Sequence, residues 1–378
     1  MGPLDGVPSS DMTGRRRLLG CRALLAAVVL LSAAACSSGA STPSGSAQPA
    51  TEPSTAPPVT GQVPGRLIPV GTGAEGVVVS SAGTAAVLVR DPNVLALVDL
   101  DTGTVRQRVP LPSAGRHLGI EAPDGPVLVP LEGADTLLFV DPSSGEVTRR
   151  VEKLTRNPHD AAPLPGGVVG VTDELGGGMY FLPAGGGAPT RLAGPRQPGG
   201  VTGVGRYAVA IDVRGGGVRV YDPSVPKELV SAPLGTGLTH LVTVDGSRVA
   251  VADSGGGRVL IEQITPELAD SVSLPAAGRP YGLAVDQARH RLYVALSARN
   301  QVLVYDTRML RDGAAPLGTI ATVQQPYTLA ADPRNGDLVV AGQATGVLQV
   351  VPYADVPGTT PTDKTVPPPP SSTASPAG

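Results

Sequence analysis

Short apolar runs, and not helix-period patterns, dominate the chain between residues 66 and 355. Each run holds four to seven residues rich in Val, Leu and Ile, and Gly, Asp, Asn or Pro residues separate the runs. Such runs are typical of β-strands joined by tight turns. The pattern therefore predicts an all-β domain over residues 66–355.

One of these runs returns about every 42 residues. It occurs seven times and ends at residues 99, 141, 183, 222, 262, 306 and 352. A Gly, Asn or Asp stands six residues before each end: Asn93, Asp135, Gly177, Gly216, Gly256, Asn300 and Gly346. These residue types tolerate the positive φ of a tight hairpin turn. A repeat of this length with four short strands predicts a seven-bladed β-propeller with four-stranded blades.

The two ends of the repeat region indicate how the ring closes. The seventh repeat lacks a fourth strand, because the chain turns to Pro and Thr after Tyr353, and a spare strand at residues 65–71 precedes the first repeat. Pairing that strand with the third strand of the last blade would leave no open sheet edge. We therefore expect the N-terminal strand to close the last blade.

Several repeats resemble a known family. The stretches "HRLYVALSARNQVLVYDT" (290–307) and "SRVAVADSGGGRVLIEQ" (247–263) resemble the YVTN-type propeller repeat of bacterial exported and surface-layer proteins. The stretches "GRPYGLAVD" (278–286) and "QQPYTLAAD" (324–332) are similar to the start of that repeat. The resemblance implies a seven-bladed propeller. It says little about activity, because one fold serves many functions.

The N-terminus is typical of an export signal. Four arginines precede the apolar stretch at residues 23–35. As a helix this stretch would span ~20 Å, less than the ~30 Å hydrocarbon core of a bilayer, so a lasting membrane span is not expected. The run "RRRLL" at residues 15–19 leaves both the general secretory route and the twin-arginine route open.

The sequence "SAAAC" ends this stretch and resembles a bacterial lipobox. The resemblance implies lipidation of Cys36 and removal of residues 1–35 as a lipoprotein signal peptide. An ordinary small-residue cleavage site beside an incidental cysteine is the alternative. Cys36 would be the only cysteine left, which excludes a disulfide within the mature chain. We therefore expect an exported protein held on the outer face of the cytoplasmic membrane.

Two stretches flank the repeats. Residues 36–65 and 356–378 are rich in Ser, Thr and Pro and contain few large apolar side chains. Such segments cannot bury enough apolar surface to offset the entropy of folding. We expect a disordered tether before the propeller and a disordered tail after it, and a monomer overall.

Charge and motifs disfavour several classes of function. The whole chain has a net charge of −3 and no basic stripe, which disfavours a nucleic-acid partner. It contains no G-x-S-x-G elbow, phosphate-binding glycine loop or pair of metal-binding cysteines. The sequence thus predicts no nucleic-acid partner and names no catalytic residue.

Three of the four histidines fall at one repeat position. The first residue of the innermost strand is in turn Glu75, His117, His159, Gly199, His240, Tyr281 and Tyr327. Innermost strands surround the central channel of a propeller. We therefore expect these side chains to form a ring at one mouth of the channel, the funnel mouth. The fourth histidine, His290, falls in a turn on the opposite face.

The ring offers several kinds of chemistry. Imidazoles are common metal ligands, so His117, His159 and His240 are candidate ligands for Zn²⁺, with Asp160 as a further ligand or a partner of one. Hydrogen bonding of the rings to neighbouring loops is the alternative. Three aspartates at the ends of second strands could bind Ca²⁺ or cap the turns that follow them: Asp173, Asp212 and Asp253.

Arginines lie on the connections that lead into the innermost strands. They are Arg116, Arg156, Arg196 and Arg279. Guanidinium groups bind carboxylates and phosphates in a bidentate manner, so these residues could hold an anionic ligand. The alternative is that they serve only as surface cations.

These observations favour a lipid-anchored, extracytoplasmic propeller that acts as a binding or scaffold module through its funnel mouth. The residues expected at the ligand site are Glu75, Arg116, His117, His159, Asp160, His240, Arg279, Tyr281 and Tyr327. Two alternatives remain. One is a propeller enzyme, because lactonases and a lyase share the seven-bladed fold and use the same mouth, some with a divalent metal. The other is a metal-binding partner of a transporter.

Overall fold

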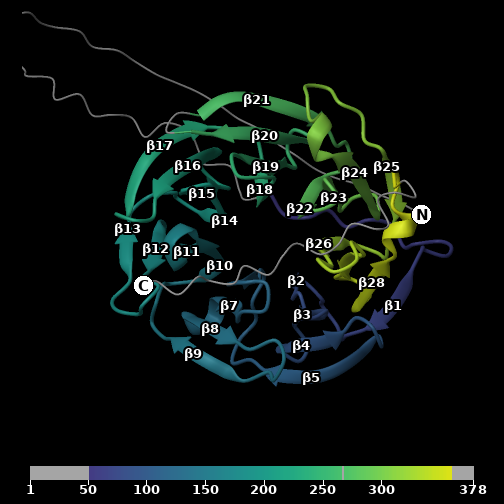
Figure 1. Cartoon of the computed structure of the whole chain (residues 1–378), viewed down its shortest axis with the longest axis horizontal. Coiled ribbons are helices and arrows are strands. Elements are labelled where there is room, and N and C mark those ends of the chain that lie inside the picture. The colour runs from purple at the N-terminus through teal and green to yellow at the C-terminus, as the bar shows by residue number, and fades with distance from the viewer. Residues whose placement is uncertain (1–50, 266–267, 360–378) are drawn as a thin grey trace, which may run out of the picture. The chain divides into compact units, whose positions relative to one another are not determined.

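The computed structural model describes residues 51–265 and 268–359. These residues form seven four-stranded antiparallel sheets, arranged as blades around one axis (Figure 1). The predicted signal peptide and Cys36 lie outside the described residues. Within the described part, no helix is long and apolar enough to cross a membrane. The predicted seven-bladed propeller is confirmed.

In each of the first six blades, four consecutive strands run from the axis to the rim. The first blade contains β2 (Val77–Val79), β3 (Thr84–Val89), β4 (Val94–Asp99) and β5 (Thr104–Pro110). The second contains β6 (Gly119–Ile120), β7 (Val127–Leu131), β8 (Thr136–Val140) and β9 (Val147–Val151). The third contains β10 (Pro158–Leu164), β11 (Val168–Asp173), β12 (Met179–Leu182) and β13 (Thr190–Leu192).

The later blades follow the same order. The fourth contains β14 (Pro198–Val204), β15 (Tyr207–Asp212), β16 (Gly217–Asp222) and β17 (Lys227–Pro233). The fifth contains β18 (Leu238–Thr243), β19 (Arg248–Asp253), β20 (Arg258–Ile264) and β21 (Leu268–Pro275). The sixth contains β22 (Pro280–Asp286), β23 (Arg291–Leu296), β24 (Gln301–Asp306) and β25 (Gly318–Ala321). Short 3₁₀ turns are η1 (Glu132–Ala134), η2 (Pro165–Gly167), η3 (Thr307–Met309) and η4 (Tyr353–Asp355).

The seventh blade joins the two ends of the chain. Its inner strands are β26 (Pro326–Ala331), β27 (Leu338–Gly342) and β28 (Val347–Val351), and its outer strand is β1 (Arg66–Pro69). The strand β1 pairs antiparallel with β28, with Ile68 opposite Leu348. The expected closure by the N-terminal strand is thus confirmed.

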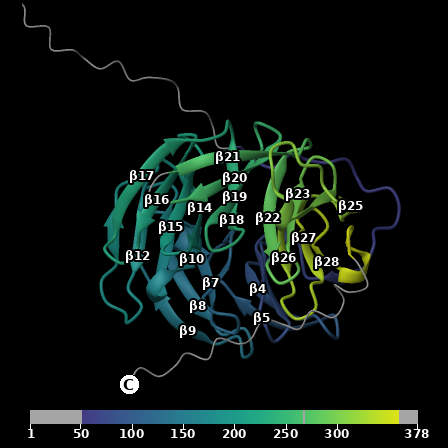
Figure 2. The ribbon, with the colours of Figure 1, turned by 45° about the horizontal axis from the view of Figure 1, so that its top comes forward.

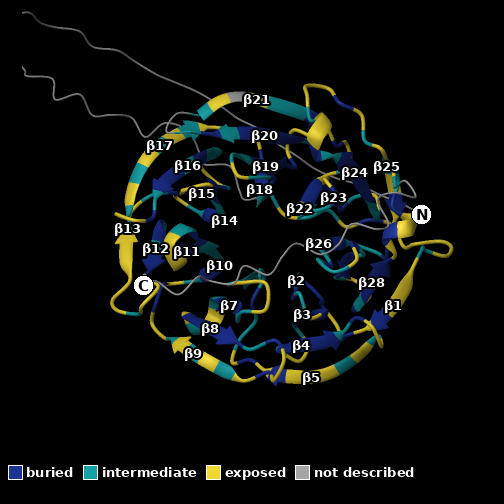
Figure 3. Cartoon of the chain, in the orientation of Figure 1, coloured by how far each residue is buried: buried dark blue, intermediate teal, exposed yellow. Residues whose placement is uncertain are grey.

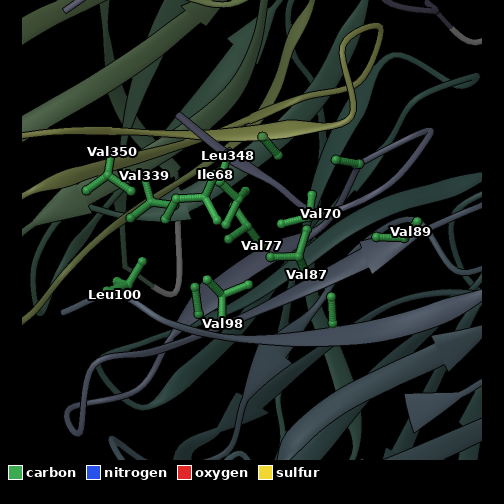
Figure 4. Packing of buried hydrophobic residues seen from close by; sticks show 14 of the residues in the cluster. Ile68, Val70, Val77, Val87, Val89, Val98, Leu100, Val339, Leu348 and Val350 are labelled. Atoms are coloured by element: carbon green, nitrogen blue, oxygen red, sulfur yellow. The ribbon is translucent and has the colours of Figure 1, made fainter. Parts of the chain in front are cut away.

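Apolar side chains fill the space between adjacent blades. The middle strands bury both faces, and all six residues of β3 are buried. The outer strands bury fewer residues, and along β17 exposed residues alternate with partly buried ones (Figure 3). At the closure, Ile68, Val87, Val98 and Leu348 pack in one cluster shared by the first and last blades (Figure 4). Each pair of adjacent blades thus shares an apolar cluster of its own.

The innermost strands lie close to one another around the axis. The tilted view shows β10, β14, β18, β22 and β26 side by side (Figure 2). Glycine makes this approach possible, because a Cβ on Gly282 would lie 2.3 Å from the backbone oxygen of Tyr327. A Cβ on Gly119 would lie 2.2 Å from the backbone oxygen of Ala161. Side chains at the start of these strands are thereby brought within contact distance.

The hairpin turns follow the predicted register in five of seven repeats. The residues with positive φ are Asp135, Gly177, Gly216, Asn300 and Gly346. In the fifth repeat Gly257 and not Gly256 has positive φ, because Asp253 pairs with Arg258. The predicted end of that repeat was therefore one residue early, and the equivalent residue is Gln263. In the first repeat a cis Asp91–Pro92 bond precedes Asn93, and the turn has a different geometry.

Contacts with the propeller extend beyond residues 66–355. Residues 51–65 were expected to belong to the tether, but Ala56 is 2% exposed and the backbone oxygen of Pro64 accepts a hydrogen bond from Gln349 Nε2 at 2.9 Å. At the other end, Val356 is buried and the oxygen of Gly358 accepts a bond from Arg291. Composition alone does not reveal these contacts, because side chains far away in the sequence make them.

We predict that truncating Ile68 opens the closing blade. The side chain is 2% exposed within the shared cluster, so Ile68→Ala should lower the free energy of unfolding by about 2–5 kcal/mol. Its neighbour Leu67 is 48% exposed, and Leu67→Ala should change the free energy by only about 0.5 kcal/mol. Urea denaturation of the two variants measures both values. Equal effects would show that β1 does not hold the ring closed.

Candidate functional site

Five aromatic side chains of the predicted ring contact one another at the funnel mouth. The ring centroids of His117 and His159 lie 4.6 Å apart, and those of His117 and His240 lie 4.7 Å apart. His240 lies 4.3 Å from Tyr281, which lies 5.0 Å from Tyr327. Most of these pairs meet edge to face, an arrangement that the charge distribution of aromatic rings favours. The mouth of the channel is therefore filled by packed rings.

Gly199 is the one ring position without a side chain. A Cβ there would lie 2.5 Å from Cγ1 of Val213, so the local packing requires glycine. The fourth blade therefore adds no ring at this repeat position, although its Val213 lines the cavity beside His117 and His159. The imidazole of His117 contacts both His159 of the third blade and His240 of the fifth.

Glu75 completes the ring but pairs within its own blade. It is 2% exposed, and its Oε2 lies 2.6 Å from Nη2 of Arg90, the residue that follows β3. Burial raises the pKa of Glu75, against the opposing charge of Arg90. Glu75 and Arg90 thus add a partly buried ion pair beside the aromatic rings.

His159 lies between two carboxylates. Its Nδ1 lies 2.9 Å from Oε1 of Glu132 and 3.2 Å from Oε2 of Glu174. Burial alone would lower the pKa of His159, but the hydrogen bonds and charges of the two glutamates outweigh it and raise this pKa to about 9. Burial likewise opposes ionisation of Glu174, yet His159 lowers the pKa of Glu174 to about 2. At neutral pH the group contains an imidazolium held by two carboxylates.

The other two ring histidines are neutral. Burial, together with the charge of His159, holds the pKa of His117 well below its ordinary range and lowers that of His240 to about 3. Both ring nitrogens of His240 are buried, and neither has a hydrogen-bond partner among the described residues. One repeat position thus presents imidazoles in two charge states.

The converging metal donors differ from the expected set. In the described part of the chain, donor atoms of Glu132, His159 and Glu174 lie within 4.8 Å of one another. Of the three histidines predicted as ligands, only His159 belongs to this group. Packing of His117 and His240 edge to face against neighbouring rings places them in contact without joining this donor set.

The sequence did not lead us to predict Glu132 and Glu174 as site residues, although their spacing carries a signal. Each directly follows the second strand of its blade, β7 or β11. They are 42 residues apart, as are His117 and His159. Applying the repeat register to the residue after each second strand would therefore have placed both carboxylates beside the ring.

Asp160 takes a structural role. Its two carboxylate oxygens accept hydrogen bonds from the backbone N–H groups of Ala161 and Val201, each at 2.9 Å. Val201 lies on β14, so this contact fastens the third blade to the fourth. Burial raises the pKa of Asp160 to about 6. The side chain is not part of the converging metal donors.

Among the predicted arginines, Arg116 joins the site. Its Nε lies 3.7 Å from Oε1 of Glu132, and its Nη1 lies 3.4 Å from Oε2 of Glu52. Burial opposes its charge, but these two carboxylates raise the pKa of Arg116 above its ordinary value. The remaining three are exposed at the surface: Arg156, Arg196 and Arg279. Arg116 therefore connects the histidine–carboxylate group to the segment that contains Glu52.

The aspartates at the ends of second strands cap turns. Oδ1 of Asp173 accepts bonds from the backbone N–H groups of Arg156 and Gly176. Asp212 and Asp253 make the same kind of contact in the fourth and fifth blades. This capping accounts for their recurrence in the repeat without a Ca²⁺ site. His290 lies exposed in the turn between β22 and β23, on the face opposite the funnel mouth.

A small cavity lies beside the rings. Its lining includes Thr51, Glu52, Arg116, His159 and Glu174. The volume is about 20 Å³, room for one water molecule or ion. The polar groups of the site thus face a space of atomic size, closed on one side by residues that precede the propeller.

Comparisons with known proteins support the fold. No protein-family model matches the chain, and no curated protein matches it. Solved structures do. One is hydrazine synthase of Kuenenia stuttgartiensis, with a TM-score of 0.63 and 18% identity, covering 78% of this chain and 97% of that chain.

Two further structures are equally similar. Virginiamycin B lyase of Staphylococcus aureus has a TM-score of 0.64 and 14% identity, covering 76% of this chain and 98% of its own. The Cps50 (Swd1) β-propeller domain of Myceliophteria thermophila has a TM-score of 0.63 and 12% identity, covering 76% and 99%. At these identities the likeness concerns the fold alone. The chain shares the β-propeller architecture with proteins of different kinds, two of them named as enzymes.

Proposed function

We propose that the protein is a lipid-anchored, extracytoplasmic binding module and that the funnel mouth is its binding site. One observation carries this proposal: charged side chains gather, buried or half-buried, at one end of the axis. They are Glu75, Arg90, Arg116, Glu132, His159 and Glu174. Burying charges is costly, and clusters of buried charged side chains are therefore candidates for functional sites.

The anchor fits the position of this mouth. Residues 51–64 lie against the propeller, so the expected tether shortens to residues 37–50, between Cys36 and Thr51. Because Thr51 lines the cavity at the funnel mouth, lipidated Cys36 would hold this mouth toward the membrane surface.

We predict that Cys36→Ser releases the protein from the membrane. The thiol is the only lipid acceptor in the mature chain, so this variant should lose both fatty-acid labelling and the membrane-bound fraction. Expression in a bacterial host with lipoprotein processing, followed by metabolic labelling and fractionation, measures both. Cys21→Ser, inside the predicted signal, serves as the control and should behave like the parent chain. Equal labelling of the Cys36 variant would refute the anchor.

A divalent cation is a second candidate, favoured by the converging donors. Nδ1 of His159 and one oxygen each of Glu132 and Glu174 supply three ligands of the types that Zn²⁺ and Mn²⁺ accept. The proton on Nδ1 of His159 faces both carboxylates, and a cation would take its place. A fourth position would face the small cavity. The function would then be binding of a cation, or of a ligand through a cation.

We predict that Zn²⁺ binds this group and binds more tightly as pH rises. The metal must displace the proton of His159, whose pKa is about 9, so below that pH the affinity should rise about tenfold per pH unit. Calorimetric titration with ZnCl₂ between pH 6 and pH 8 measures the slope. Glu132→Gln and Glu174→Gln should each lower the affinity at least about tenfold.

The matched control for these variants is Glu146→Gln, at an exposed position in the turn between β8 and β9. It should bind Zn²⁺ as the parent chain does. If the Glu132 and Glu174 variants bind like this control, the metal candidate fails. The binding proposal would then rest on the charged mouth alone.

The enzyme alternative gains no support from the comparisons. The lyase among the similar structures is 14% identical, which relates the folds and not the active sites. The transporter-partner alternative shares the metal prediction and needs a partner that no observation identifies. Binding at the funnel mouth therefore remains the proposal that the geometry supports best.

A further inference from the structure

The residues that precede β1 lie across the funnel face as a bound peptide would. This N-terminal segment, residues 51–64, has almost no regular secondary structure, yet it contacts the sixth and seventh blades. In Figure 1 it is the purple end of the described chain, which leads into the outer strand of the last blade. Its contacts define a groove on the same face as the histidines.

Most of these contacts involve the backbone of the segment. The N–H of Ser54 donates to Oγ of Ser297 at 3.2 Å. The oxygen of Ala56 accepts a bond from Nε2 of Gln324, and the oxygen of Pro57 accepts one from Nδ2 of Asn300, both at 2.8 Å. Backbone contacts of this kind hold an extended peptide without reading its side chains.

The groove is built before the segment enters it. Ser297 is fully buried, and its Oγ also donates to the backbone oxygen of Arg279. Oδ1 of Asn300 accepts a bond from the backbone N–H of Gln325, which fixes the amide. The sixth blade therefore holds the Ser297 hydroxyl and the Asn300 amide in place, and Gln324, on the connection to the seventh blade, adds a second amide.

Two side chains of the segment add selectivity. Ala56 is 2% exposed, so the groove accepts only a small side chain there. Glu52 lies at the funnel mouth, with its carboxylate 3.4 Å from Nη1 of Arg116. The Glu52 side chain is 62% exposed, which leaves this end of the segment weakly held in water.

Few contacts hold a stretch that has much backbone entropy to lose. A second peptide with the same backbone path, a small residue at the buried position and a carboxylate at the mouth would make the same contacts. An ion pair with Arg116 distinguishes such a peptide from a basic one.

We infer that the funnel face is a groove for an extended acidic peptide and that residues 51–57 of the chain itself occupy it until such a peptide displaces them. The inference rests on the proposed function, because it names the class of ligand that the funnel mouth binds. The ligand is a Ser-, Thr-, Pro- or Ala-rich segment carrying one carboxylate.

The test uses a fluorescently labelled peptide, TEPSTAPP, which repeats residues 51–58. In the whole chain, Ala56→Arg places a large cation where the groove is closed and should expel the chain's own segment. This variant should bind the peptide at least about tenfold more tightly than the parent chain, as fluorescence anisotropy measures. A peptide with Lys in place of Glu52 should bind about two- to fivefold more weakly, because the ion pair with Arg116 is exposed to water.

Two isosteric changes remove the groove's donors. Asn300→Asp and Gln324→Glu keep the shape and the acceptor oxygens but lose the N–H groups that the segment uses. Added to Ala56→Arg, they should abolish the gain in affinity. If Ala56→Arg binds no better than the parent, or if the donor changes leave binding intact, the inference is wrong.

A second measurement needs no variant. Excess unlabelled peptide should increase hydrogen exchange at the amide of Ser54 in the parent chain, and unchanged exchange would count against displacement. ZnCl₂ titration of the same samples separates the two proposals. Zinc binding without peptide binding overturns the peptide groove only, whereas peptide binding without zinc binding overturns the cation candidate only.

Discussion

The pairing of β1 with β28 is the constraint on which the rest of the structure depends. It joins residues 66–69 to a blade made from the last strands of the chain, so the seven sheets have no free ends at which to separate. Once the ring is closed, any position of the repeat becomes a circle of seven side chains. The contact of His117 with His240 exists for this reason, since 123 residues separate them in the sequence.

Closure also brings the innermost strands close together around the axis, and this close packing influences which side chains at the mouth are charged. Glycines such as Gly282 let inner strands approach until the rings at their starts touch. Water is largely excluded there, so each charge depends on its immediate neighbours. His159 has two carboxylates and is charged, whereas His240 has no polar partner in the part of the chain that the structure describes and is neutral. Equivalent repeat positions therefore differ in chemistry because the residues after the second strands differ.

The periodicity of the sequence was enough to predict the fold, the closing strand and the positions that meet at the mouth. It did not identify which histidine would be charged, because that depends on Glu132 from the preceding blade. Nor did it show that Asp160 would accept hydrogen bonds from the backbone N–H groups of Ala161 and Val201, because Val201 lies on the neighbouring blade.

The N-terminal segment shows a different limit. Its composition indicated disorder, and that inference considers only what a segment can bury by itself. Here the hydrogen-bond donors belong to Asn300 and Gln324, more than 240 residues away in the sequence. No property of residues 51–57 alone contains this information. Composition therefore shows that the segment cannot form a core of its own. It does not show that side chains from a distant part of the sequence bind the segment.

Arg116 connects the two candidate ligand sites. Its guanidinium lies between Glu52 of the segment and Glu132 of the histidine group, at 3.4 Å and 3.7 Å. A cation beside Glu132 would compete with Arg116 for that carboxylate and leave the guanidinium freer to pair with an acid in the groove. Its positive charge would also attract that acid. Both effects strengthen binding of the acidic peptide, so a bound cation should raise the affinity for the peptide. By linkage, a bound peptide should raise the affinity for the cation by the same factor. Because Glu52 is largely exposed, salt should weaken this coupling more than it weakens the buried pairing of His159 with Glu132 and Glu174.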